Sequence, residues 1–209
     1  MDYYAIKRVS NSALSRFKSE VVLGKPFQFP PRAAQFGEEL HKLLFEPHLL
    51  TAPLPGLNYT LLQRLADKVQ ADAFCQSVFG NSHKEQVILF EDDETKAPCK
   101  CKVDVIQYGE TGKATTIIDL KTTSQRDYRR FCESVLTYDY DRQAAFYLDA
   151  TGADTFMFIG IPKVKPFDLF HYEITRDQGA VAYGRKKYKA LLRKYVEHYN
   201  LAGQWERCI

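Results

Sequence analysis

Ile118-Asp119-Leu120-Lys121 ends a run of β-branched residues that starts at Thr115. Such a run is typical of a β-strand, in which side chains two positions apart point to the same face. We therefore expect Asp119 and Lys121 to project together, with Leu120 facing the core. A carboxylate beside an ammonium suits metal-assisted phosphodiester cleavage, because the carboxylate can hold Mg²⁺ while the lysine orients or deprotonates the attacking water. Alone, however, this D-x-K pattern more often marks a surface ion pair.

A second carboxylate lies one strand earlier in the sequence. Residues 101–105 alternate between apolar and polar side chains, which predicts a strand, and a turn at 108–112 joins it to the strand of Asp119. Asp104, 15 residues before Asp119, is expected near the end of that strand. Neighbouring hairpin strands would bring the two carboxylates together, and a shared metal ion would relieve their repulsion. The alternative is that Asp104 faces water.

The rest of the chain alternates helical and extended segments without a repeat or a clear linker. We expect helices at about 10–18, 31–45 and 59–74, strands at 86–90, 101–105 and 115–121, helices at 126–136 and 141–149, strands at 155–161 and 169–174, and a helix at 177–201. This order predicts an α/β fold, with helices flanking one sheet whose first three strands are antiparallel. We expect a single domain over residues 1–209, with a helical N-terminal part (about 1–75), a core (about 80–175) and a C-terminal helix (about 176–205).

Composition excludes several classes of protein. Hydrophobic residues make up 45% of the 209 residues and charged residues 26%, as in ordinary soluble proteins. No stretch has the length of a membrane helix, and the polar N-terminus does not resemble a secretory signal, so we expect a cytoplasmic protein without a membrane partner. An odd number of irregularly spaced cysteines argues against a disulfide framework and against a zinc or iron–sulfur site: Cys75, Cys99, Cys101, Cys132 and Cys208.

Basic residues gather near the C-terminus, although the formal net charge is only +3. Between positions 176 and 207 they are Arg176, Arg185, Lys186, Lys187, Lys189, Arg193, Lys194 and Arg207. Such a segment can meet phosphate electrostatically, or it can be a solvated helix face. Charge alone does not separate these two interpretations.

Two helical segments carry further candidate residues. Gln143 and Tyr147 lie four positions apart and share a helix face, where an amide and a phenol can hold a phosphate or order a base. Ordinary surface residues show the same spacing. His41 lies one turn after Gly37, which leaves room for a backbone or a ligand to approach. A lone helical histidine is more often a structural residue.

Taken together, these segments resemble the RecE-type exonuclease family, a branch of the PD-(D/E)XK nuclease superfamily related to RecB-type nuclease domains and lambda exonuclease. The similar segments run in order from Val9 to Asp149: Val9–Leu14, Phe36–His41, Cys99–Asp104, Ile118–Thr123, Tyr138–Tyr140 and Gln143-x-x-x-Tyr147. The ordered series of segments is far more specific for this family than any one segment. Nothing after Ile174 is recognisable. The cysteine cluster of the family's iron–sulfur branches is not expected, because only Cys208 lies near the C-terminus.

The resemblance implies a restriction-endonuclease-like core with a central mixed sheet, and it implies roles for individual residues. Asp104, Asp119, the backbone carbonyl of Leu120 and the ring of His41 would be metal ligands. Lys121 would be the catalytic lysine, with its pKa depressed by neighbouring cations. Gln143 and Tyr147 would support the lysine and contact DNA. Glu85 lies where the family often has an acidic residue at the start of the first strand, but a solvated glutamate fits as well.

The implied function is a Mg²⁺- or Mn²⁺-dependent exonuclease. It would degrade linear double-stranded DNA from an end, 5′ to 3′, in recombination or repair. Relatives often form ring-shaped homo-oligomers and work beside a single-strand annealing protein. Two alternatives stay open: a restriction-type or structure-specific endonuclease of the same fold, and a catalytically silent DNA-binding module.

Overall fold

One mixed sheet organises the computed structural model, which describes residues 3–27, 31–50 and 52–199. Within these residues the strands are β1 (His83–Glu91), β2 (Pro98–Tyr108), β3 (Ala114–Thr123), β4 (Thr155–Pro162) and β5 (Phe170–Thr175), in the spatial order β1-β2-β3-β4-β5. Neighbouring strands are antiparallel except β3 and β4, which are parallel. The predicted α/β class, with a mixed sheet of about five strands, is confirmed.

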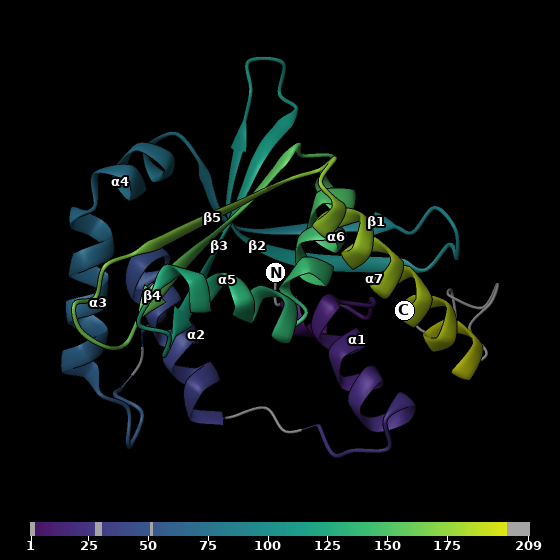
Figure 1. Cartoon of the computed structure of the whole chain (residues 1–209), viewed down its shortest axis with the longest axis horizontal. Helices are drawn as coiled ribbons and strands as arrows, with labels where there is room; N and C mark the ends of the chain where they lie inside the picture. The colour runs from purple at the N-terminus through teal and green to yellow at the C-terminus, as the bar shows by residue number, and fades with distance from the viewer. Residues whose placement is uncertain (1–2, 28–30, 51, 200–209) are drawn as a thin grey trace.

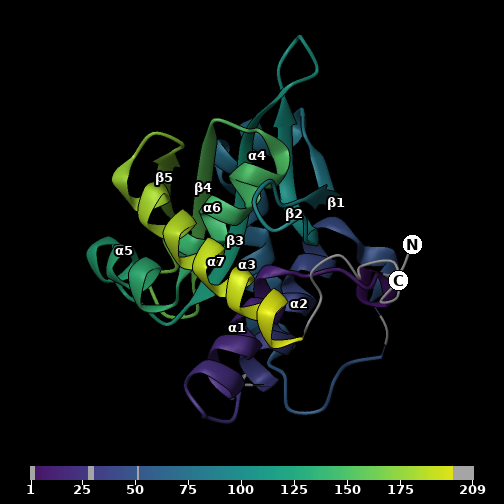
Figure 2. The same cartoon turned by 90° about the vertical axis from the view of Figure 1, so that its right-hand side faces the viewer.

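Helices cover both faces of the sheet (Figures 1 and 2). Four of the described helices pack on one face: α1 (Asn11–Phe17), α5 (Tyr128–Thr137), α6 (Tyr140–Thr151) and α7 (Gly179–His198). Three lie on the opposite side: α2 (Pro31–Phe45), α3 (Tyr59–Ala71) and α4 (Ala73–Gly80). The helix α5 leads from β3 to α6, and these two helices connect the parallel strands β3 and β4. The remaining short helical turns are η1 (Tyr3–Ala5), η2 (Lys18–Val22) and η3 (Pro47–Leu49).

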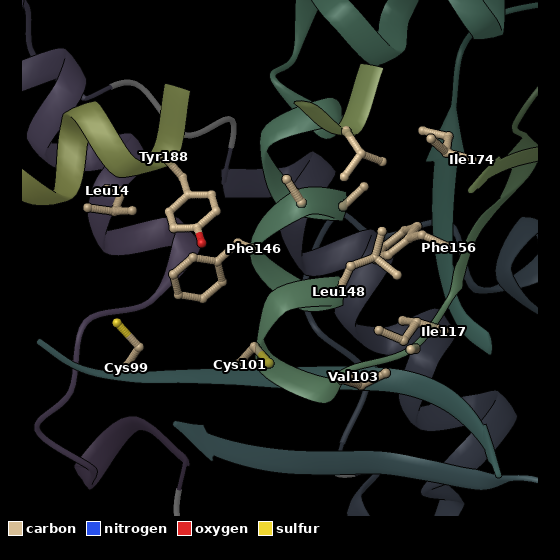
Figure 3. Packing of buried hydrophobic residues seen from close by; sticks show 14 of the residues in the cluster. Leu14, Cys99, Cys101, Val103, Ile117, Phe146, Leu148, Phe156, Ile174 and Tyr188 are labelled. Carbon is tan, nitrogen blue, oxygen red and sulfur yellow. The ribbon is translucent and has the colours of Figure 1, made fainter. Parts of the chain in front are cut away.

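Alternation along β3 divides its side chains between two apolar clusters. Ile117 points into the cluster beneath α6 and α7, whereas Ile118 and Leu120 point into the cluster beneath α2 and α3. The expectation that Leu120 faces a core is therefore confirmed. Figure 3 shows the first cluster, in which Phe146 of α6 lies beside Tyr188 of α7, their ring centroids 5.4 Å apart.

The expected helix at 59–74 is divided in two. Its first part, α3, ends at Ala71, because Asp72 adopts an extended conformation (φ −73°, ψ 122°). The Asp72 carboxylate then accepts a hydrogen bond from the backbone N–H of Cys75 and caps α4. The apolar spacing does not reveal this break, because no proline or glycine marks it.

Two other boundaries differ from the sequence-based expectation. The strand β2 continues to Tyr108, so Asp104 lies in the middle of a strand rather than near its end. Residues 106–108 extend it by pairing with β3 across the hairpin. The last helix ends at His198, and the expected continuation to position 201, with Arg207 and Cys208, lies outside the described residues. In the described ranges no helix is both long enough and apolar enough to cross a membrane.

Five of the described basic residues in the C-terminal segment form ion pairs with acidic groups of the same chain. The ion pairs are Arg176–Asp149, Arg185–Asp149, Lys187–Asp139, Lys187–Asp141, Lys189–Asp92, Lys189–Asp93 and Arg193–Glu94. These pairs attach α7 to α6 and to the turn between β1 and β2. Much of the positive charge that was a candidate for binding phosphate is therefore neutralised by ion pairs within the fold.

Close packing between α6 and α7 depends on Gly184. A Cβ atom at this position would lie 2.1 Å from the backbone oxygen of Asp141, which cannot move aside as a side chain would. We expect Gly184→Ala to lower the free energy of unfolding by about 3 kcal/mol, at the upper end of the range for overpacked cores. Gly179→Ala is the matched control, because a Cβ there has no neighbour within 4 Å and the residue lies in the same helix. Equal urea midpoints for the two variants would contradict the packing argument.

Candidate active site

The pairing between the strands is interrupted where the acidic residues lie. Paired residues of β2 and β3 end at Val105 and Ile118, so Asp104 and Asp119, the next residue on each strand, are not paired. The N–H of Leu120 donates instead to Oδ2 of Asp104, at 2.7 Å. The two strands separate at this point, and their carboxylates occupy the opening.

The neighbouring strand β1 is distorted at the same level. Glu85 has a positive φ of 53°, an uncommon conformation for a residue other than glycine. It has no partner on β2, although Lys84 pairs with Val105 and Gln86 pairs with Val103 on either side. This distortion aims the Glu85 side chain toward Asp104, so three adjacent strands supply carboxylates to one place.

The ring of His41 reaches these carboxylates from α2. Its Nδ1 lies 3.4 Å from Oε1 of Glu85 and 3.6 Å from Oδ1 of Asp104, and its Nε2 lies 3.2 Å from the carbonyl oxygen of Leu120. The possible ligand atoms of His41, Glu85 and Asp104 all lie within 4.8 Å of one another. Gly37 contributes less than expected, because a Cβ there would meet no atom closer than Thr122 Oγ1 at 3.9 Å.

The charges of this cluster are unbalanced toward the negative. Burial raises the pKa of Asp104 above its ordinary value, and the nearby Asp119 adds to the rise while His41 opposes it. Burial disfavours a charged imidazole, but the carboxylates of Asp104 and Glu85 outweigh it and raise the pKa of His41. A proton on His41 thus supplies positive charge that the site requires, and a divalent cation could supply the same charge.

Asp119 and Lys121 form a second part of the site, beside this cluster. The Nζ of Lys121 lies 2.6 Å from Oδ2 of Asp119, and Gln143 of α6 donates its amide to Oδ1 of Asp119 at 2.6 Å. Lys121 also lies over the ring of Tyr140, 5.2 Å from its centroid. The structure therefore brings the predicted carboxylate, lysine and glutamine together, with Gln143 holding Asp119 rather than the lysine.

The pKa of Lys121 follows here from the protein groups around it, and its depression by neighbouring cations stays a prediction. Burial lowers the pKa of Lys121, but the negative charge of Asp119 and its other neighbours more than offsets this, so the pKa lies above its ordinary value. The expectation assumed divalent cations beside the amine, whereas here the nearest charge is a carboxylate. Lys121 is accordingly an ammonium ion paired with Asp119.

Tyr147 lies one turn after Gln143 on α6, close enough to Asp119 and Asp104 for their charges to act on its phenol. Its ring packs near Phe146 and Phe156, with centroid distances of 6.3 and 6.0 Å, and burial raises the pKa of its phenol well above the ordinary value. In this position the Tyr147 ring can support the packing of α6 against the sheet. A contact with DNA, which the sequence resemblance implied, stays a prediction.

The donor groups fit a hard divalent cation. Oε1 of Glu85 is buried and lies 3.4 Å from Nδ1 of His41, while Oε2 lies 2.5 Å from Nζ of Lys102. Buried carboxylates need compensating positive charge, and a divalent cation could supply it at this place instead of the proton on His41. Carboxylates with one imidazole are ligands that Mg²⁺ and Mn²⁺ accept. His41, Glu85 and Asp104 could hold such an ion, while ligand roles for Asp119 and the carbonyl of Leu120 stay predictions.

Sequence analysis did not single out two residues of this site. Lys102 joins Glu85 to Glu46, whose Oε2 lies 3.2 Å from the ammonium. It precedes Asp104 by two positions on β2, and that spacing was the available signal. Tyr140, under the ammonium of Lys121, belonged to a recognised segment but had no assigned role.

The sequence matches one protein family over residues 27–208. That family is described as a PDDEXK-like domain of unknown function (DUF3799). The chain belongs to this family. The letters D, E and K in that description stand for acidic residues and a lysine, the residue types that Asp104, Asp119 and Lys121 bring together here. No curated protein matches the sequence.

A solved structure shares the fold of this PDDEXK-like domain. A protein from Eubacterium rectale, provisionally described as an exonuclease, superimposes with a TM-score of 0.65 and 18% identity, covering 91% of this chain and 84% of that one. An alkaline exonuclease from Laribacter hongkongensis has a TM-score of 0.46 and 17% identity, covering 99% and 97%. At 18% identity, the similarity to the Eubacterium rectale protein establishes the fold alone.

Proposed function

We propose that this PDDEXK-like domain is a divalent-metal-dependent deoxyribonuclease that degrades linear double-stranded DNA from its ends, in the 5′-to-3′ direction, during recombination or repair. One observation carries the proposal: His41, Glu85 and Asp104 converge within 4.8 Å, beside the ion pair of Asp119 and Lys121. The exonuclease part rests on the sequence resemblance, and relatives described as exonucleases agree with it. A ring-shaped assembly, an annealing partner, a cytoplasmic location and one domain over residues 1–209 are proposed on the sequence alone.

His41, Glu85 and Asp104 would hold Mg²⁺ or Mn²⁺, with Asp119 at the edge of the same opening. When bound, the ion would neutralise the scissile phosphate and lower the pKa of a water molecule. Asp104 also fixes the backbone at Leu120 through the hydrogen bond to its N–H, and this positions Asp119 and Lys121 on either side.

The ammonium of Lys121 would orient the attacking water and stabilise the negative charge that grows on the phosphate. Gln143 keeps the Asp119 carboxylate facing the lysine, because its amide occupies the other carboxylate oxygen. In-line attack would then break the bond to the 3′ oxygen and leave a 5′ phosphate. The first product released from a 5′ end would be a mononucleotide.

Digestion of three labelled substrates tests the proposal. With Mg²⁺, we expect linear duplex DNA labelled at its 5′ ends to lose the label early and 3′-labelled duplex to lose it late, while a covalently closed circle stays intact. With a chelator in place of Mg²⁺, all three should persist. Nicking of the circle would instead show an endonuclease, and DNA binding without any Mg²⁺-dependent cleavage would show a catalytically silent module.

A further inference from the structure

A second cluster of possible metal ligands lies on the α4 side of the sheet. We propose that Asp72, Cys75 and His171 form a zinc-type metal site that joins α4 to the strand β5. Their ligand atoms all lie within 4.8 Å of one another. The cluster shares no residue with the site of His41, Glu85 and Asp104, so the two proposals stand or fall separately.

The first turn of α4 places two of these side chains together. Asp72 caps the helix, and one of its carboxylate oxygens accepts a hydrogen bond from the N–H of Cys75 at 2.9 Å. The same carboxylate also interacts with the thiol of Cys75, so these two ligand groups already face one another. Cys75 is fully buried as a free thiol, three residues along the chain and therefore on the same side of the first turn.

The third side chain comes from far away in the sequence. His171 lies on β5, opposite Ile159 of β4, and its ring lies 4.3 Å from the ring of Phe74. The Phe74 ring restrains the orientation of the imidazole, and Phe74 belongs to the same helical turn as Cys75. Nearly one hundred residues separate the parts of the cluster, so a bound ion would tie the helical layer to the strand β5.

His171 supplies the observation that points to a missing ligand. Its Nε2 is buried and has no hydrogen-bond partner among the described residues. Buried polar atoms are rarely left unsatisfied, because each costs free energy that a partner would recover. Helix capping and the interaction with the Cys75 thiol account for Asp72 and Cys75, but not for the unpaired nitrogen of His171, whereas one metal ion could bind all three side chains.

The chemistry of the three groups selects the metal. A thiolate and an imidazole with one carboxylate are ligands for Zn²⁺, whereas Mg²⁺ prefers oxygen ligands. Tetrahedral Zn²⁺ brings its ligand atoms to about 3.3–3.7 Å from one another, so the side chains need to close by about 1 Å. The thiol of Cys75 would lose its proton to solvent on binding. Water would complete the coordination from a depression beside Asp72, which Lys68, Ala71, Ala73, Asp168 and Leu169 also line.

Cobalt titration of the full-length protein tests this site. After treatment with a chelator, added Co²⁺ should produce a near-ultraviolet thiolate-to-cobalt charge-transfer band that saturates at about one equivalent per chain. Zn²⁺ should then remove the band by displacing the cobalt. The nuclease site cannot produce this band, because its candidate ligands include no thiol. No thiolate band at saturating Co²⁺ would overturn the proposal.

Variants connect the band to the three residues. Cys75→Ala should abolish the band, and His171→Gln should weaken cobalt binding at least tenfold while leaving the buried thiol in place. Cys132→Ala is the matched control, because Cys132 is also a free thiol but belongs to neither cluster. An unchanged band in Cys75→Ala would contradict the assignment. A band in wild-type protein that cleaves no DNA would support the zinc site and count against the nuclease.

Discussion

Asp119→Asn should lower the rate of DNA cleavage about 10³-fold at saturating Mg²⁺. The Asp119 carboxylate accepts from Gln143 at 2.6 Å and faces the ammonium of Lys121 at 2.6 Å. Asparagine keeps the shape but removes the charge, and its amide would present a donor to the ammonium. Charge stabilisation in such sites contributes several kcal/mol to the transition state, and about 4 kcal/mol corresponds to that factor. Single-turnover cleavage of a linear end-labelled duplex measures it.

Asp154→Asn is the matched control for this prediction. Asp154 makes an exposed ion pair with Lys113, at 3.0 Å, and exposed pairs contribute little. We expect its cleavage rate and melting temperature to equal those of the wild type. If Asp119→Asn cleaved DNA at the wild-type rate after the same purification, Asp119 would have no part in the chemistry.

Sequence periodicity predicted the sheet better than it predicted the helices. Alternating or β-branched runs identified the strands at 101–105 and 115–121, because burial on a pleated surface imposes a period of two. The break between α3 and α4 was missed, because it depends on a single side-chain hydrogen bond, in which the Asp72 carboxylate caps α4. The extent of β2 was also missed, since residues 106–108 are held by pairing with β3 rather than by an apolar pattern of their own.

The site was predictable in part. Spacing alone suggested that Asp119 and Lys121 share a face and that Asp104 lies across a hairpin, and the structure brings the three together. Resemblance offered Glu85 as a candidate beside the alternative of a solvated glutamate, but its orientation was not predictable, because it depends on a positive φ within β1 that no local residue pattern demands. Resemblance supplied His41 and Gln143, whose positions depend on packing between segments far apart in the chain.

The paired charges of α7 show why net charge is a poor guide to DNA binding here. Lys189 meets both Asp92 and Asp93, and Lys187 meets both Asp139 and Asp141. These lysines are therefore already paired with acidic residues of the same chain. Positive charge at the active site comes instead from Lys121 and Lys102, close to the carboxylates.

Lys121→Met should lower the cleavage rate about 10²- to 10⁴-fold, the range for loss of a positioned acid–base group. Methionine has a similar length but no charge, so the growing charge on the phosphate would lose a stabilising partner. Asp119 would also lose its counter-ion at 2.6 Å. His41, Glu85 and Asp104 are unchanged in this variant, and we expect the Mg²⁺ concentration for half-maximal activity to stay within a few-fold of the wild type.

The effect on Mg²⁺ dependence separates Lys121 from the metal ligands. His41→Ala removes a candidate ligand and should raise the Mg²⁺ concentration for half-maximal cleavage more than tenfold, the scale on which ligand environments affect metal affinity. Lys121→Met should leave that concentration nearly unchanged and lower the maximal rate. Lys121→Arg restores the positive charge beside Asp119, so part of the lost rate should return if the ammonium acts through its charge. A maximal rate in Lys121→Met equal to that of the wild type would exclude this lysine from the chemistry, because the ion pair with Asp119 would then be structural only.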